Sequence, residues 1–144
     1  MIKVLMADDH AILREGLKQL FAWAGDIVVS SEAVNGTQVL ELLGRDCFDI
    51  LLLDMAMPEP SGAELISMIC ARNLALPILV LTMHNDPQIA KKALQAGAAG
   101  YLTKDSDPEN LLAAIREVAG GGRYIADSLR GEFGFGKMGE RKGF

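Results

Sequence analysis

The chain has 144 residues, 50% of them hydrophobic, and a formal net charge of −5 at pH 7, which predicts one globular domain with a substantial core. Outside its carboxyl-terminal stretch it has no basic stripe, so the acidic balance argues against a duplex-DNA-binding domain. No apolar run reaches the roughly 18 residues of a membrane span, and the amino-terminal MIKVLMADDH turns polar too early for a signal peptide, so we expect a soluble, cytoplasmic protein.

Five short apolar runs predict β-strands. In chain order they are expected over residues 3–7, 27–34, 48–54, 77–82 and 98–103. The third and fourth runs, FDILLLD and PILVLT, are apolar without alternation, which is typical of strands buried on both faces of a parallel sheet.

Between and after these strands, apolar residues recur at helical spacing. In the first such segment, residues 11–25, one apolar side is expected to consist of Ile12, Leu13, Leu17, Leu20, Phe21 and Ala24. Trp23 of the same segment is expected in the margin of the core or at an interface. Cap pairs mark the starts of the later helices: Asn35 with Gln38, Ser61 with Glu64, Asp86 with Pro87 and Asp107 with Pro108.

Strand and helix alternate five times with short connections. This pattern predicts an α/β fold, a doubly wound five-stranded parallel sheet of flavodoxin-like order 2-1-3-4-5 with helices on both faces. We expect the domain to cover residues 1–120. Residues 121–144 are rich in glycine and show no periodicity, so we interpret them as a flexible linker or an expression-derived tail.

Polar residues stand where the predicted strands end. Asp8 and Asp9 follow the first strand, Asp54 ends the third, Thr82 ends the fourth and Lys104 follows the fifth. Because the carboxyl ends of parallel strands open on one edge of a sheet, where ligands bind, we expect these five side chains to converge.

Three clustered carboxylates cannot all stay ionised without a cation. Oxygen ligands without histidine or thiolate indicate a hard ion, and Mg²⁺ fits because it binds through few carboxylates and keeps waters or phosphate oxygens. Lys104 offers a point charge for phosphate and Thr82 a hydroxyl donor. This constellation predicts phosphoryl transfer, with Asp54 as the nucleophile that forms an aspartyl phosphate.

Several residues receive structural interpretations instead. Asp9 taken alone could cap the first helix, and His10 and His84 are interpreted as loop histidines. Residues expected to fill gaps near the site are Met55, Met57 and Met83. The two cysteines, Cys47 and Cys70, lack metal-site spacing and are expected to be buried, reduced thiols.

Four stretches carry a resemblance to a known family: VLMADDHAILREGL, DILLLDMAMPEPSG, ILVLTMHND and AAGYLTKD. Over about residues 2–120 the chain resembles the receiver domain of two-component response regulators, most closely the NarL/FixJ (LuxR-type) subfamily. The resemblance implies a role for each matching residue: Asp54 as phosphoacceptor, Asp8 and Asp9 as the Mg²⁺-holding pair with Asp9 a direct ligand, the Ala56 carbonyl as another ligand, Thr82 and Tyr101 as a switch pair, and Lys104 as the phosphate-binding lysine.

Two positions depart from the family pattern. Asp105 follows Lys104 where the family often has a proline after a cis bond, which leaves the isomer of the Lys104–Asp105 bond open. Met83 stands where a small residue is common and is expected to narrow the path to Asp54. The resemblance further implies that Ala56 and His84 tune the lifetime of the phosphoryl group.

The resemblance implies phosphorelay signalling, with a sensor histidine kinase as donor and a possible homodimer after phosphorylation. Output would be transcription regulation by a carboxyl-terminal DNA-binding domain outside these 144 residues, so we expect neither DNA nor membrane contact by this domain and no turnover of a separate substrate. Two alternatives remain: a pseudo-receiver that binds partners without phosphorylation, and a Mg²⁺-dependent phosphatase of the haloacid-dehalogenase type. The latter's DxD motif is absent from the first strand, where the acids are adjacent.

Overall fold

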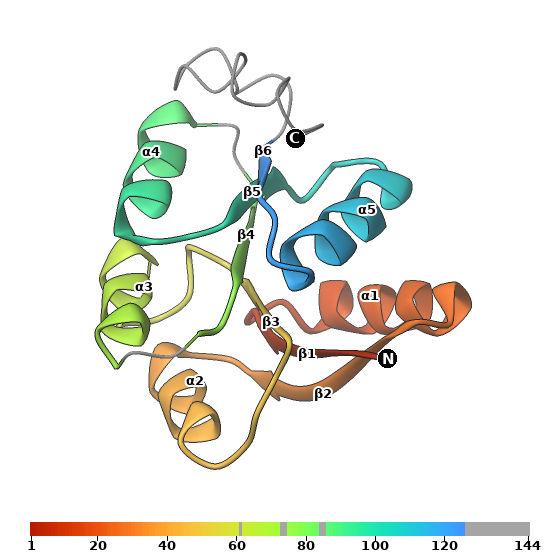
Figure 1. Ribbon diagram of the computed structural model, residues 1–144, viewed down its shortest axis with the longest axis horizontal. Coiled ribbons are helices and arrows are strands. Elements are labelled where there is room, and N and C mark those ends of the chain that lie inside the picture. Colours follow the sequence, from red (N-terminus) through yellow and green to blue (C-terminus); the bar gives the residue numbers. More distant parts are fainter. Residues whose placement is uncertain (61, 73–74, 84–85, 126–144) are drawn as a thin grey trace.

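The computed structural model describes residues 1–60, 62–72, 75–83 and 86–125, and these build one parallel sheet with helices on both faces (Figure 1). The strands are β1 (Ile2–Ala7), β2 (Ile27–Ala33), β3 (Ile50–Leu53), β4 (Ile78–Thr82), β5 (Gly100–Thr103) and β6 (Tyr124–Ile125). The helices are α1 (Ala11–Ala24), α2 (Gly36–Leu43), α3 (Gly62–Ala71), α4 (Pro87–Ala96) and α5 (Pro108–Ala119).

The strand order is β2-β1-β3-β4-β5-β6, and every neighbouring pair is parallel. The predicted order of the first five strands is confirmed. The sixth strand was not predicted and lies in the glycine-rich stretch interpreted as linker or tail. It forms because the Tyr124 N–H donates to the Ala99 carbonyl oxygen at 3.1 Å and Ile125 is buried against the outer edge of β5.

Alternate side chains of the central strands point to opposite faces of the sheet and pack in two separate hydrophobic cores. Leu51 and Leu53 of β3 pack on the side of α2, α3 and α4, whereas Ile50 and Leu52 pack on the side of α1 and α5. Figure 1 shows the same division, with α1 and α5 on one side of the sheet and the other helices opposite. Both faces of β3 are therefore covered, which explains its uninterrupted apolar sequence.

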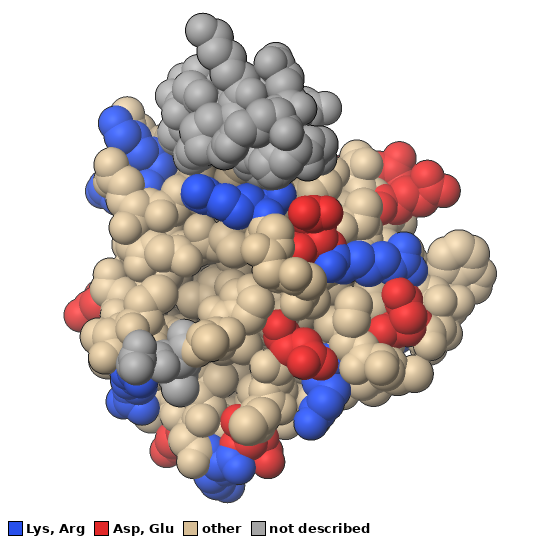
Figure 2. Space-filling view, in the orientation of Figure 1, with Lys and Arg blue, Asp and Glu red and all other residues tan. Residues whose placement is uncertain are grey.

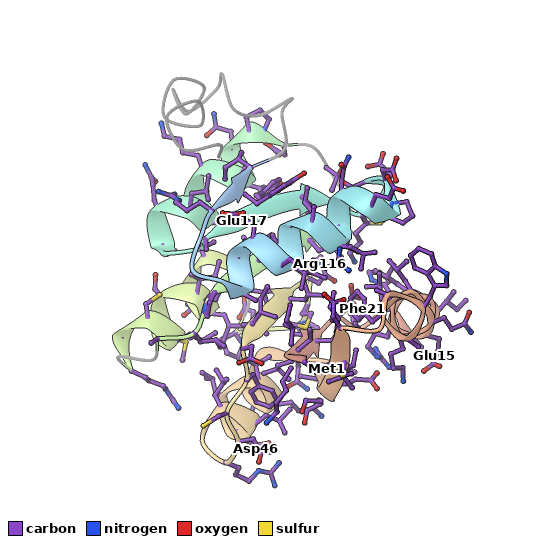
Figure 3. The ribbon with its side chains drawn as sticks, turned by 45° about the vertical axis from the view of Figure 1, so that its right-hand side comes forward. Met1, Glu15, Phe21, Asp46, Arg116 and Glu117 are labelled. Atoms are coloured by element: carbon purple, nitrogen blue, oxygen red, sulfur yellow. The ribbon has the colours of Figure 1, made fainter. Side chains whose placement is uncertain are left out.

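Helix α1 buries fewer apolar side chains than the spacing of its apolar residues predicts. Leu17 and Phe21 are buried, and Phe21 lies between α1 and α5 (Figure 3). Ile12 is 89% exposed and Trp23 is 78% exposed, so the placement of Ile12 on the apolar side and of Trp23 in the core margin is wrong. Each directly precedes a partly buried residue, Leu13 or Ala24, and one step along a helix turns a side chain about 100° away.

Three of the predicted helix caps are confirmed. Asn35, Asp86 and Asp107 each accept a hydrogen bond from the backbone N–H that follows within the first helical turn. The N-cap position of α1 is His10, which makes no side-chain cap bond, so Asp9 is not the cap of that helix. Ser61, the partner in the predicted capping box of α3, lies outside the described residues.

A glycine holds α2 close to the loop that follows β3. A Cβ atom at Gly36 would collide with the backbone oxygen of Pro60, so only glycine allows this approach. The peptide bond between Glu59 and Pro60 is cis. The contact fixes the loop that leaves Asp54 against the helix beside it.

Both cysteines lie at the surface. Cys47, between α2 and β3, and Cys70, on α3, are free and exposed, so their predicted burial is wrong. The apolar character of cysteine favours burial on average, but here larger aliphatic residues fill both cores. Within the described residues, none of the helices has the length and apolar character needed to cross a membrane.

Candidate functional site

Four strand ends meet at the carboxyl edge of the sheet. Asp8 follows β1, Asp54 follows β3, Thr82 ends β4 and Lys104 follows β5. Backbone bonds continue the sheet one residue past the strands: the Asp54 N–H donates to the Ala7 carbonyl oxygen at 2.9 Å, and the Lys104 N–H donates to the Thr82 carbonyl oxygen at 2.6 Å. The chain thereby sets these side chains at fixed positions on one edge, as the sequence predicts.

Lys104 is the cation that two buried carboxylates share. Its Nζ lies 2.8 Å from Oδ2 of Asp8 and 3.3 Å from Oδ2 of Asp54. The side chains of Lys104 and Asp8 are each 5% exposed and that of Asp54 is 1% exposed. Such buried carboxylates remain ionised only with close compensation, which one lysine supplies to both.

Burial raises the pKa of Asp54 above its ordinary value, and the neighbouring charge of Asp8 raises it further. The N–H of Ala56, which donates to Asp54 Oδ1 at 3.1 Å, and the ammonium of Lys104 oppose this rise. The other oxygen, Oδ2, is buried and has no hydrogen-bond partner among the described residues. This oxygen is therefore available for a cation or for covalent chemistry.

The side chains around this oxygen fit a divalent cation. Asp8, Asp9, His10 and Asp54 each offer one ligand atom, and these atoms lie within 4.8 Å of one another. Asp9 and His10 are the exposed members, whereas Asp8 and Asp54 are buried. Three carboxylates, one of them with an oxygen that makes no hydrogen bond to the described residues, suit a hard ion such as Mg²⁺. The Ala56 N–H donates to Asp54 Oδ1, and the ligand role of the Ala56 carbonyl stays a prediction.

Thr82 and Tyr101, the predicted switch pair, touch each other. Both are buried, and burial raises the pKa of Tyr101. Hydrogen bonds from the backbone of Asp86 and from the Thr82 side chain to the Tyr101 hydroxyl act in the opposite direction. Because Asp86 caps α4, the tyrosine connects the end of β4 with the start of that helix.

Two predicted neighbours of the site lie as expected and one does not. Met57 is buried and Met55 partly buried against the core, as gap-filling residues should be. Met83 is 63% exposed, so its predicted filling of a gap is wrong. It stands on the loop after β4, where it lines a surface pocket of about 450 Å³ with His10, Leu13, Lys104 and Asp105. The bond between Lys104 and Asp105 is trans; His84 lies outside the described residues.

His10 is the site residue that the sequence interpretation missed. Its Nδ1 lies 2.7 Å from Oδ1 of Asp8, although the sequence suggested only a loop histidine. The available indication was its position directly after the acidic pair in ADDH. The direction of its ring, however, depends on how the chain turns from β1 into α1, which spacing alone does not reveal.

Comparison with known proteins agrees with this geometry. The family model described as the response regulator receiver domain matches residues 4–116. The nitrate/nitrite response regulator NarL of Escherichia coli K12 is 40% identical over 126 residues, which cover 88% of this chain and 58% of that protein. UvrY, a response regulator of the same strain, is 36% identical over 129 residues, covering 90% and 59%. The chain thus spans about three fifths of the length of these relatives.

Solved structures give the same assignment. A LuxR-family two-component response regulator from Aurantimonas sp. SI85-9A1 superposes with a TM-score of 0.86 at 33% identity, covering 96% of this chain and 99% of that one. The signal receiver domain of the putative regulator NarL from Mycobacterium tuberculosis gives a TM-score of 0.79 at 35% identity, covering 83% and 97%. The chain belongs to the response regulator receiver family, in its NarL/FixJ (LuxR-type) subfamily.

Proposed function

We propose that this domain accepts a phosphoryl group on Asp54 from the phosphohistidine of a sensor histidine kinase. The observation that carries the proposal is the buried Oδ2 of Asp54, which makes no hydrogen bond to the described residues and lies 3.3 Å from the Lys104 ammonium at the carboxyl edge of the sheet. A carboxylate in this position has a neighbour that can neutralise an incoming phosphoryl group. Membership of the receiver family supports the same assignment.

The transfer needs positioning and charge neutralisation rather than a strong base. Oδ2 of Asp54 attacks phosphorus, the phosphorus–nitrogen bond of the donor breaks, and the donor imidazole leaves with its electron pair. Oδ1 stays oriented by the Ala56 N–H. Lys104 pairs with a phosphoryl oxygen, and the Thr82 hydroxyl donates to another. Mg²⁺ held by Asp9, Asp54 and the Ala56 carbonyl, with Asp8 beside it, would neutralise the negative charge that gathers there.

The same contacts offer a route from the phosphoryl group to the surface. If Thr82 turns toward the phosphoryl group, its hydrogen bond with Tyr101 changes, and Tyr101 also contacts Asp86 at the start of α4. The surface of α4, β5 and α5 then shifts between two arrangements and binds a partner or a second copy of the chain. This is a population shift within one fold.

The output proposed for the whole protein is transcription regulation through a carboxyl-terminal DNA-binding domain. The support is that a relative with 35% identity is described as a probable transcriptional regulatory protein. On the face shown in Figure 2, Lys and Arg side chains are interspersed with Asp and Glu, which does not suit a phosphate backbone. The receiver itself acts as a stoichiometric acceptor with autodephosphorylation, and its cytoplasmic location stays a prediction.

Intact-mass measurement after incubation with acetyl phosphate and Mg²⁺ tests the proposal. We expect one added phosphoryl group on the wild-type chain, lost in Asp54→Asn and retained in Asp46→Asn, a matched change of an exposed aspartate. No added mass on the wild type would favour a pseudo-receiver. Rapid phosphate release from many small phosphate esters would favour a phosphatase.

Met83, Ala56 and His84 are proposed to set the rates at which the phosphoryl group is gained and lost. Met83 lines the pocket that opens over Lys104 and His10, so Met83→Ala should speed both phosphorylation by small donors and hydrolysis of the aspartyl phosphate. Substituting Ala56 or His84 should change the decay rate without abolishing phosphorylation. Decay of the purified phosphoprotein, followed by mass, checks these expectations; unchanged decay in all three variants contradicts them.

A further inference from the structure

The imidazole of His10 lies inside the proposed cation site, although the proposed phosphoryl transfer assigns it no task. Its Nδ1 is 2.7 Å from Asp8 Oδ1, 3.6 Å from Asp9 Oδ1 and 3.7 Å from Asp54 Oδ2. The backbone N–H of His10 also donates to Asp8 Oδ1, at 2.8 Å. One ring nitrogen therefore faces all three carboxylates that would hold the ion.

The surroundings of this nitrogen conflict when no cation is bound. Nδ1 also lies 3.1 Å from the Lys104 ammonium. With a proton on Nδ1, the ring donates to Asp8 but faces an ammonium that can only donate. Without that proton, Nδ1 accepts from Lys104 but turns its lone pair toward a carboxylate oxygen of Asp8. A divalent cation among the carboxylates removes the conflict, because the lone pair then faces a metal.

A second observation points to a ligand in the same space independently of His10. Oδ2 of Asp54 belongs to a side chain that is 1% exposed, and it has no hydrogen-bond partner within the described part of the chain. It lies 3.7 Å from Nδ1. A buried oxygen that makes no hydrogen bond to the described residues and an imidazole nitrogen thus border one small volume, and both are metal-ligand atoms.

We propose that His10 binds the cation directly through Nδ1, which makes the site a mixed nitrogen and oxygen site. This inference rests on the cation site of the proposed function. Carboxylates with waters suit Mg²⁺, whereas an imidazole adds affinity for later first-row cations such as Co²⁺ and Ni²⁺. The site would therefore accept those ions as well as Mg²⁺, and His10 would decide how strongly it distinguishes them.

Calorimetric titration of the tag-free protein with Ni²⁺ and with Mg²⁺ tests this assignment. His10→Asn keeps an amide N–H that can donate to Asp8 but removes the ligand nitrogen, and the side chain is 52% exposed, so the fold should be kept. We expect Ni²⁺ to bind at least tenfold more weakly, about 1.4 kcal/mol, while Mg²⁺ affinity changes little. The chain has two histidines, so His84→Asn is the matched control and should change neither affinity.

Pulsed electron paramagnetic resonance on the Mn²⁺-loaded protein gives a direct readout. We expect a ¹⁴N coupling in the wild type and in His84→Asn that is absent in His10→Asn. Equal weakening of both ions in His10→Asn would mean that the ring only orients Asp8 and would overturn the inference. Unchanged Ni²⁺ and Mg²⁺ binding in that variant would overturn it as well, yet leave the proposed cation site intact. A wild type that binds neither ion would remove the cation site itself.

Discussion

The two ends of the sheet each carry a cluster of oppositely charged side chains. Comparing them distinguishes the effect of ion pairing from the effect of burial. At the amino end, Arg116 donates to Asp26 through two bonds, of 2.8 and 2.9 Å, with side chains 46% and 48% exposed. Arg116 and Met1 are labelled at this end in Figure 3. At the carboxyl end, Lys104 serves two carboxylates that water hardly reaches. The exposed pair, Arg116 with Asp26, has the more complete hydrogen bonding, although water could solvate both of its charges.

The pKa of an aspartate is shifted in opposite directions at the two ends of the sheet. The hydrogen bonds from Arg116 lower the pKa of Asp26, whereas burial raises the pKa of Asp54 despite the nearby Lys104. At the amino end, water and a dedicated partner both favour the charge. At the carboxyl end, burial disfavours the charged form of Asp54. A chemical change at Asp54 should therefore alter the free energy of unfolding more than a change at Asp26 does.

The largest expected effect comes from removing the shared cation. Lys104→Met leaves Asp8 and Asp54 facing each other without compensation, so we expect a loss of about 3 kcal/mol in the free energy of unfolding at pH 8, typical of breaking a buried ion pair. At pH 5 the loss should be smaller, because burial raises the pKa of Asp54, so a larger share of this group is uncharged as the pH falls. Urea unfolding without divalent ions measures both values. An equal loss at both pH values would mean that Lys104 acts through packing alone.

A smaller effect of opposite sign is expected for Asp54→Asn. Since the folded-state pKa of Asp54 is raised, ionisation of this group destabilises the fold increasingly as pH rises above its ordinary value of 3.8. Asparagine removes that penalty, and Asp8 remains as the partner of Lys104, so the variant should be more stable at pH 7, by less than Lys104→Met loses. The gain should disappear at pH values below 3.8. Thermal unfolding across pH measures it, with Asp46→Asn as control; a gain independent of pH would contradict the burial argument.

The smallest effect is expected at the amino end. Arg116→Met removes the partner that lowers the pKa of Asp26, so the lost stability should be present above the ordinary pKa of 3.8 and vanish at lower pH. Because both groups are exposed, the shift of the urea midpoint should be well below that of Lys104→Met, and high salt should abolish it. A shift as large as that of Lys104→Met would break the comparison, since exposure would then not govern the strength of the pair.

The strand order and the convergence at the carboxyl edge could be predicted because they follow from periodicity and from one topological rule. FDILLLD and PILVLT are apolar without interruption, and polar residues end each strand. In a doubly wound parallel sheet these facts place Asp8, Asp54 and Lys104 together. None of this required knowledge of side-chain rotamers, which is why it survived comparison with the structure.

The features that escaped prediction depend on tertiary detail. β6 is two residues long, and it pairs only because its partner edge is already in place. The outward direction of Ile12 depends on where the buried stripe of α1 is centred, to within one residue. The exposure of Cys47 and Cys70 depends on which other side chains fill the cores. The inward direction of His10 depends on the turn between β1 and α1.

The position of β6 bears on how a signal could leave the domain. Ile125 stands in register with Tyr101 on the neighbouring strand, and adjacent strands lie about 4.8 Å apart. The backbone of Ile125 thus lies one strand spacing from the backbone of Tyr101, the residue whose ring the proposed switch moves. A domain linked to the chain after β6 would therefore sense the movement of Tyr101 directly, because β6 pairs with the strand that carries this residue.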